Sequence, residues 1–439
     1  MQRSDQSVSD VPFRTQFHLL SNAFQQTRIV IDYSVFDRGD RRLGNPLRTL
    51  LDLPVQEKSD RGLEHTPREI WQQPATWRDT WQRCFDRQPE LQDALRRAGI
   101  GRGSTSSPTV YLLGAGTSDY IGRALAPLLR RQWGCDVWAI PSTTLLTEFE
   151  EFHRPGREYL WISFSRSGDS PEGVALLERA LDRDREIRHL VITCNQQGTM
   201  AQLCEQHPDR ALALVLGDAV NDRALAMTSS FTNMLLAGQC VGHLEEFTEF
   251  GKVVAQVVDA GQQFLPQAAE VAAAITMLGC TRACFVGSGA LGAVAAESAL
   301  KVVELSAGKV STISETTLGL RHGPMSSVDG QTLFVAFLSS DARRRGYELD
   351  LVREIDRKRL GRVRAVVSVQ GIDDVASLAD YTLALQCPPD FPDYYRPVLD
   401  VMFGQLIGLF ASMRCGLKPD QPSPNGAITR VVQPIKLYS

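Results

Sequence analysis

Short apolar runs alternate along most of the chain with longer stretches in which apolar residues recur at helical spacing. The runs have the length of buried strands, and those in the first half of the pattern are Val110–Leu113, Leu160–Phe164, His189–Ile192 and Ala211–Leu216. A chain in which strand and helix alternate predicts an α/β fold with a parallel sheet and helices on both faces.

This pattern occurs twice. Leu113-Gly114-Ala115-Gly116 closes one apolar run, and Val286-Gly287-Ser288-Gly289 closes another, each just before a helical stretch. Further along, Leu160–Phe164 has a counterpart in Leu333–Phe337, and the spacing from Gly116 to Phe164 is 48 residues, as is that from Gly289 to Phe337. We therefore expect two copies of one doubly wound domain, at residues 100–250 and 265–420.

Three segments lie outside the two copies: an extension at 1–45, a helical segment at 46–99 and a C-terminal tail at 421–439. The extension is polar apart from one strand-like run at Ile29–Tyr33, and we interpret it as poorly ordered. In the helical segment, Thr66 precedes Pro67 and lies three residues before Glu69. This arrangement predicts a helix that begins with a capping box.

Composition narrows the choice of partners. The 439 residues suffice for two or three domains. A net charge of -4 gives no electrostatic case for binding nucleic acid or an anionic membrane. A small anionic ligand would have to be held by a local site.

The cysteines and the absence of long apolar segments indicate the compartment. Nine cysteines are scattered, and Cys280 and Cys284 are the one close pair, so neither a disulfide framework nor a metal set is expected. No segment resembles a signal-peptide core or approaches the roughly 20 apolar residues that span a bilayer. We expect a cytoplasmic protein.

Two turns in the first copy are candidates for binding an anion. Gly114–Ser118 lies where a strand passes into a helix, although such a turn is also a common plain connection. Ser165–Pro171 brings hydroxyls, an arginine and a glycine to the next helix start, where the helix dipole favours a dianion. Ser170 also fits a simple helix cap, but capping does not explain Ser165 and Ser167.

The second copy has lost this loop pattern. Its equivalent, Leu338–Ala342, has no glycine and no Ser-x-Ser spacing, so we expect one phosphate site per chain. The helix after Gly289 instead carries Glu297, Lys301 and Glu304 on one face. Such a stripe is often a solvated face, but the helix is otherwise apolar or small, which favours the border of a polar pocket.

Two further features stand out. His322 is flanked by Gly319 on one side and by Gly323 and Pro324 on the other, which predicts that it lies at the tip of a loop. Its role could be catalytic or structural. Ala224–Thr232 opens an apolar helix with four hydroxyls, of which capping explains at most two.

Together, seven collinear segments resemble the sugar isomerase (SIS) domain family. The closer resemblance is to its galactosamine-6-phosphate deaminase/isomerase branch, also called tagatose-6-phosphate ketose/aldose isomerase. The likeness runs from about Leu50 to the C-terminus. The segments are His65–Ile70 with Gln72–Pro74, Gly114–Ser118, Ser163–Pro171, Ala226–Thr232, Gly287–Ala290, Arg321–Pro324 and Pro422–Val432.

The resemblance implies two tandem SIS domains that act on a sugar phosphate, a tail that closes the site, and no metal or organic cofactor. The residues that it implies for substrate binding are Thr117, Ser118, Ser165, Arg166, Ser167, Ser170, Thr228 and Ser229. Glu304 matches the family's general base, and Lys301 a lysine near the first carbons of the sugar. His322 matches a residue that assists ring opening across a subunit interface, which implies a homodimer or a higher homo-oligomer with a shared active site.

The chain departs from a better-known relative, glucosamine-6-phosphate synthase. That enzyme uses a C-terminal lysine for a Schiff base and an N-terminal glutaminase domain. Residues 422–430 contain no lysine, and no cysteine follows Met1. Three hypotheses remain: conversion of galactosamine 6-phosphate to tagatose 6-phosphate with loss of ammonia, ketose/aldose isomerisation without it, and a sugar-phosphate sensor. The presence of Glu304 and His322 argues against the sensor hypothesis. The sequence does not distinguish galacto from gluco substrates.

Overall fold

The computed structural model describes residues 44–101, 107–369, 373–433 and 435–438. The chain divides into two units, Met1–Leu43 and Gly44–Ser439. The predicted extension therefore lies outside the described residues, Ile29–Tyr33 included, apart from Gly44 and Asn45. Asn45 caps the first helix with its side chain and donates a hydrogen bond to the carbonyl of Pro266.

The first sheet has five parallel strands in the order β2-β1-β3-β4-β5. Its strands are β1 (Thr109–Gly114), β2 (Val137–Pro141), β3 (Tyr159–Ser165), β4 (Ile187–Thr193) and β5 (Ala211–Val215). Its helices are α6 (Thr117–Trp133), α7 (Ser142–Thr147), α8 (Phe149–Phe152), α9 (Pro171–Arg183), α10 (Thr199–Gln206) and α11 (Ser229–Gly242). β1 and β3 are buried along their whole length, which matches their continuous apolar runs.

The second sheet repeats this arrangement. Its five parallel strands are β6 (Arg282–Gly287), β7 (Ser311–Thr316), β8 (Thr332–Phe337), β9 (Val363–Val369) and β10 (Tyr381–Leu385), in the order β10-β9-β8-β6-β7. Read from β7, this is the strand order of the first sheet. The turns that open α6 and α13 (Ala290–Leu305) also agree, because Gly116 and Gly289 have φ of 56° and 59°. Two parallel sheets flanked by helices confirm the predicted fold class.

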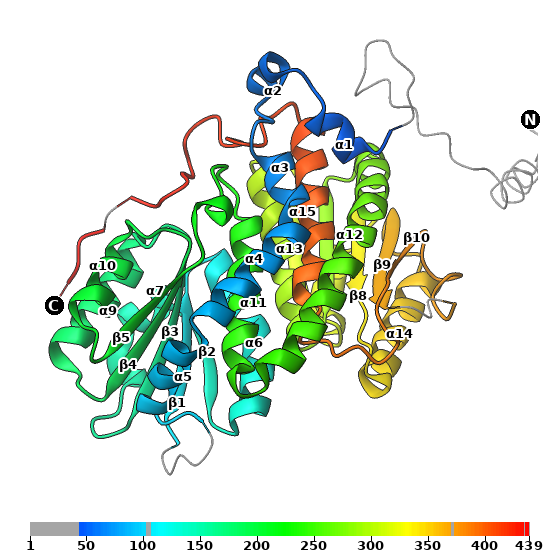
Figure 1. The fold of residues 1–439 in the computed structure, drawn as a ribbon. Helices are drawn as coiled ribbons and strands as arrows, with labels where there is room; N and C mark the ends of the chain where they lie inside the picture. Colours follow the sequence, from blue (N-terminus) through cyan, green and yellow to red (C-terminus); the bar gives the residue numbers. More distant parts are fainter. Residues whose placement is uncertain (1–43, 102–106, 370–372, 434, 439) are drawn as a thin grey trace, which may run out of the picture. The chain divides into compact units, whose positions relative to one another are not determined.

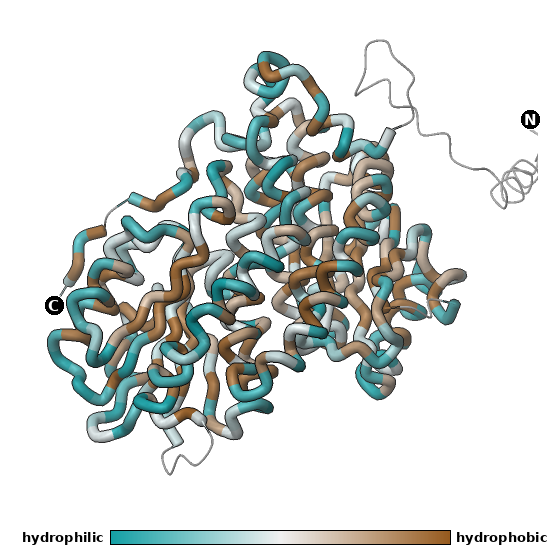
Figure 2. The backbone as a smooth tube through the Cα atoms, in the orientation of Figure 1, coloured by the Kyte–Doolittle hydropathy of each residue, from teal (hydrophilic) through white to brown (hydrophobic). Residues whose placement is uncertain are grey.

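A layer of helices lies between the two sheets (Figure 1). It includes α13, α12 (Phe247–Met277) and α15 (Pro397–Arg414), and α6 of the first copy packs against α13 of the second. Figure 2 shows hydrophobic residues concentrated on the strands and on these helices. Among the described helices, none is both long and apolar enough to cross a bilayer.

The N-terminal segment forms five helices, and the predicted capping box at Thr66 and Glu69 is wrong. Its helices are α1 (Pro46–Leu51), α2 (Val55–Arg61), α3 (Thr66–Trp71), α4 (Gln73–Asp86) and α5 (Gln88–Arg97). The hydroxyl of Thr66 donates to Asp420 Oδ1 at 2.7 Å, and Glu69 Oε1 accepts from the backbone N–H groups of Arg223 and Ala224. Asp420 also accepts from the backbone N–H of Thr66, so a distant carboxylate caps α3 in place of the local pair.

Candidate active site

A cleft of about 500 Å³ opens at the carboxyl edge of the first sheet. It is lined by the turn Ala115–Ser118, by residues that follow β3, by two side chains of α13 and by tail residues 426–433. In Figure 1 the tail, in red, runs along this side of the first copy. Six residues predicted to bind substrate line the cleft: Thr117, Ser118, Ser165, Arg166, Ser167 and Ser170. They come from the ends of neighbouring parallel strands, where ligands of doubly wound sheets bind.

Three hydroxyls follow one another in the loop Ser165–Ser170, which we call the first serine loop. Ser165 Oγ accepts from the N–H of Gly168 at 3.1 Å, and Ser167 Oγ accepts from that of Asp169 at 3.2 Å. Ser170 Oγ accepts from the N–H of Gly173 at 3.3 Å and caps α9. None of the three hydroxyls donates to another described residue, so each proton is available to an acceptor in the cleft. Ser170 can therefore cap α9 and still donate its hydroxyl proton to an acceptor in the cleft.

The guanidinium of Arg166 is buried and does not point its terminal nitrogens at the hydroxyls. Nη1 donates to the carbonyl of Leu225 at 3.1 Å, and Nη2 donates to that of Arg430 at 2.5 Å. Burial lowers the pKa of Arg166, and the neighbouring Arg430 lowers it further. Arg166 therefore ties the tail to the first serine loop.

The charged stripe of α13 is buried and internally paired, so the alternative of a solvated face is wrong. Glu297 and Lys301 have side chains that are 0 % and 1 % exposed, whereas that of Glu304 is 23 % exposed and lines the cleft. Lys301 Nζ lies 2.5 Å from Glu304 Oε2, 3.4 Å from Glu297 Oε1 and 3.0 Å from Thr117 Oγ1. One lysine thus fixes the carboxylate at the cleft and joins the two copies.

Burial shapes the protonation of this cluster. It raises the pKa of Glu297 to about 8, and the negative charge of Glu304 adds to the effect while Lys301 opposes it. Burial would lower the pKa of Lys301, but the two carboxylates raise it more, so the lysine stays charged. Thr117 Oγ1 accepts from Lys301 and donates to Glu297 Oε1 at 3.3 Å. Glu304 is thus a cleft-facing carboxylate with a fixed cation beside it.

Three residues predicted to belong to the site do not line the cleft in the single chain: Thr228, Ser229 and His322. Thr228 is fully buried, and Ser229 donates its hydroxyl to the carbonyl of Glu69 at 2.6 Å, because the start of α11 packs against the N-terminal helices. His322 lies on an exposed loop and does not line the cleft. Its loop joins the 3-10 turns η4 (Gly319–Arg321) and η5 (Pro324–Ser327).

Some residues that line the cleft were not predicted from the sequence. Thr143, Glu172, Leu225 and Met227 border the cleft with the tail. The tail matched the family pattern at Pro422–Val432, which was the signal that it belongs to the site. Arg430 carried no local pattern of its own.

Comparison with known proteins now assigns a family. No protein-family model matches the chain. The D-galactosamine-6-phosphate deaminase AgaS of Escherichia coli O157:H7 is 36% identical over 332 residues, which are 75% of this chain and 85% of that protein. The protein of the same name from Shewanella sp. (strain ANA-3) is 31% identical, over 88% of this chain and 95% of its own length.

A solved structure agrees. The crystal structure of tagatose-6-phosphate ketose/aldose isomerase from Escherichia coli superimposes with a TM-score of 0.75 at 33% identity, over 81% of this chain and 95% of that chain. The chain belongs to the AgaS family of proteins with two sugar isomerase domains.

Proposed function

We propose that the protein converts D-galactosamine 6-phosphate and water to D-tagatose 6-phosphate and ammonia. One observation carries the proposal: the first serine loop and the Glu304–Lys301 pair open into the same cleft. A loop of hydroxyls suits the phosphate, and a fixed carboxylate suits proton transfer on the sugar. The names of the relatives point to the same substrate.

The proposed reaction uses these groups in sequence. The hydroxyls of Ser165, Ser167 and Ser170 hold the phosphate at the start of α9. Glu304 takes the proton from C2 of the open-chain sugar, and the resulting enolamine is protonated at C1 to give an imine at C2. Water adds to the imine carbon, and ammonia leaves, which yields the ketose. Lys301 keeps Glu304 in place and stabilises its charge.

The proposal needs no Schiff base with the protein. Lys301 is the one lysine among the described residues that line the cleft, and its ammonium contacts Thr117, Glu297 and Glu304. Ketose/aldose isomerisation is the second candidate function, since proton transfer by Glu304 serves both reactions. The tagatose-6-phosphate ketose/aldose isomerase name of the structural relative favours it.

The position of His322 bears on the assembly of the protein. His322 is exposed and lies outside the cleft of its own chain, which suits a histidine that assists ring opening in a second copy. We therefore propose a homo-oligomer, at least a dimer, with a shared active site. We propose a cytoplasmic location, where a phosphorylated amino sugar would be available.

Ammonia release tests the function. Galactosamine 6-phosphate and glucosamine 6-phosphate are each incubated with the wild type, with Glu304→Gln and with Glu270→Gln. Glu270 is exposed on α12, so its variant is the matched control. We expect release from the galacto substrate that Glu304→Gln abolishes and Glu270→Gln preserves. No ammonia from either substrate, together with interconversion of ketose and aldose phosphates, would replace the deaminase by the isomerase.

A further inference from the structure

The second copy has its own loop at the end of β8, Leu338–Asp341, which we call the second serine loop. It occupies the position that the first serine loop has in the first sheet, between a central strand and the next helix, α14 (Ala342–Arg357). Its last residue caps that helix, because Asp341 Oδ1 accepts from the N–H of Arg344 at 2.9 Å. Three residues separate Phe337 from Asp341, whereas five separate Phe164 from Ser170. The loop is shorter, yet it keeps two adjacent hydroxyls, Ser339 and Ser340.

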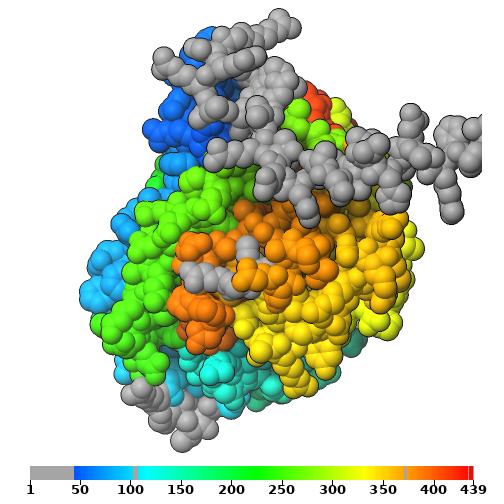
Figure 3. Space-filling model, turned by 90° about the vertical axis from the view of Figure 1, so that its right-hand side faces the viewer, coloured from blue at the N-terminus to red at the C-terminus, as the bar shows by residue number. Residues whose placement is uncertain are grey.

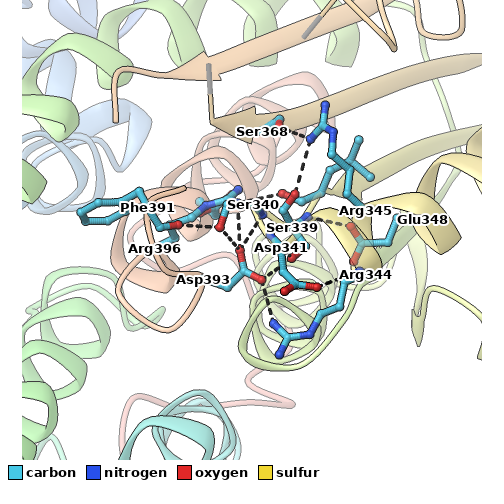
Figure 4. A network of polar contacts seen from close by, with 12 residues as sticks. Ser339, Ser340, Asp341, Arg344, Arg345, Glu348, Ser368, Phe391, Asp393 and Arg396 are labelled. Atoms are coloured by element: carbon cyan, nitrogen blue, oxygen red, sulfur yellow. Dashed lines mark hydrogen bonds and ion pairs between the residues drawn. The ribbon is translucent and has the colours of Figure 1, made fainter. Parts of the chain in front are cut away.

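A carboxylate of the protein occupies this loop (Figure 4). Asp393 Oδ1 accepts from the N–H of Ser340 at 2.8 Å, from its hydroxyl at 2.9 Å and from Arg396 Nη1 at 3.4 Å. Asp393 Oδ2 accepts from the hydroxyl of Ser339 and from Arg344 Nη1 at 3.0 Å. Five polar groups thus surround one carboxylate that is only 4 % exposed, and the hydroxyl of Ser340 shares its proton with the carbonyl of Phe391 at 2.6 Å.

The donors around Asp393 are those that bind phosphate in other proteins. Hydroxyls, a backbone N–H at a helix start and guanidinium groups are the usual partners of a tetrahedral oxyanion. Burial raises the pKa of Asp393, but these hydrogen bonds and Arg396 lower it more, so the carboxylate is charged. The loop therefore holds an anion.

Asp393 reaches the loop from another part of the chain. It lies between β10 and α15, and this orange segment borders the yellow region of α14 on the face in Figure 3. Arg396, three residues later, donates to the carbonyl of Leu338 at 2.7 Å and pairs with Asp400. The segment is thus anchored to the second serine loop by more than the one carboxylate.

We propose that the second copy retains an anion site and that the side chain of Asp393 fills it. The carboxylate stands where an inorganic phosphate or a phosphoryl group would bind, and it closes this site to such ligands. Removal of the carboxylate by Asp393→Ala leaves the hydroxyl of Ser339, the backbone N–H of Ser340 and the guanidinium of Arg344 without this acceptor. Arg396 keeps its contacts with Leu338 and Asp400 and stays at the loop. Inorganic phosphate then takes its place.

Phosphate binding tests this proposal independently of the reaction. The parent carries Ser165→Ala and Ser167→Ala, which remove two hydroxyls of the first serine loop. Isothermal titration with inorganic phosphate compares this parent with the parent plus Asp393→Ala. We expect one site per chain in the triple variant, with a dissociation constant at least about tenfold below any that the parent shows. If the folded triple variant binds phosphate no better than the parent, the proposal is overturned.

Two further variants separate the charge from its surroundings. Asp393→Asn fills the same space without the charge, and Asp390→Ala removes an exposed carboxylate from the same segment. Neither should create a phosphate site. If Asp393→Ala is too unstable for titration, its unfolding temperature is measured with increasing phosphate. A rise that exceeds that of Asp393→Asn supports the proposal, and equal responses of the two variants refute it.

Discussion

The two serine loops occupy the same place in two copies of one fold, and their hydroxyls have different partners. In the first loop, Ser165 and Ser167 accept from their own backbone and present their protons to a cleft. In the second, Ser339 and Ser340 donate to Asp393. Polar groups at the end of a buried strand need an acceptor, which a ligand or the protein itself can supply. Duplication of a scaffold therefore need not duplicate its binding site.

The two copies also contribute different residues to the cleft. The first contributes the loop and Thr117, whereas the second contributes α13 with Lys301 and Glu304. Because α6 packs against α13, the turn of one copy meets the charged stripe of the other. The second copy thus supplies charged side chains to the cleft, while Asp393 occupies its own loop.

The largest effect is expected from Lys301→Met, which removes the link between the copies. Glu304 and Glu297 would lose their shared cation, and Glu304, the proposed base, would no longer be held at the cleft. We expect turnover to fall about 1000-fold. Lys309→Met, on an exposed residue just beyond α13, should retain activity. Turnover of a folded Lys301→Met protein within about tenfold of wild type would contradict a positioning role for this lysine.

Exchange of the two serine pairs for alanine tests the comparison directly. Ser165→Ala with Ser167→Ala should lower kcat/KM about 100-fold, because two hydrogen bonds to a charged group are lost. Ser339→Ala with Ser340→Ala should leave kcat/KM unchanged, since those hydroxyls serve Asp393. Steady-state kinetics on the sugar phosphate measures both. Similar losses in the two double variants would mean that the second loop also contributes to the reaction.

The same two double variants should show the opposite order for the loss of stability, with the larger loss in Ser339→Ala with Ser340→Ala. Loss of Ser339 and Ser340 leaves the buried carboxylate of Asp393 with fewer donors, and we expect the free energy of unfolding to fall by about 2 kcal/mol. Loss of Ser165 and Ser167 should cost less, because their oxygens accept from a loop that borders solvent. Denaturant unfolding followed by circular dichroism gives both values. A larger loss in the first pair would overturn this ranking.

The sequence predicted the features that depend on local chemistry. The repeat was visible because both strand-to-helix turns need glycine at positive φ, as at Gly116 and Gly289. The first serine loop was visible because its hydroxyls lie within a few residues of one another. The buried stripe of α13 was visible because Glu297, Lys301 and Glu304 share one face of an otherwise apolar helix.

Features that depend on distant partners could not be predicted. Asp393 accepts a hydrogen bond from Ser339, which is 54 residues away in the sequence. The carbonyl of Arg430 accepts one from Arg166, which is 264 residues away. The capping box at Thr66 failed for the same reason, because Asp420 competes for its hydroxyl from 354 positions away. A local pattern states which groups need a partner, and tertiary packing decides which partner they receive.

The smallest effect concerns pH, where the two sites should respond in opposite directions. The pKa of Glu297 rises from 4.5 to about 8 on folding, so this group favours the folded state at low pH, and that contribution is lost as the pH rises toward 8. The pKa of Asp393 is lowered from 3.8, so its contribution is present above that value and is lost as the pH falls. Glu297→Gln should therefore flatten the decline of unfolding free energy between pH 4.5 and 8. Asp393→Asn should flatten only the loss of unfolding free energy that occurs as the pH falls toward 3. Denaturant unfolding of the wild type and both variants from pH 3 to 8 measures both effects. A variant that changes the pH dependence in the range assigned to the other residue would contradict the assignment.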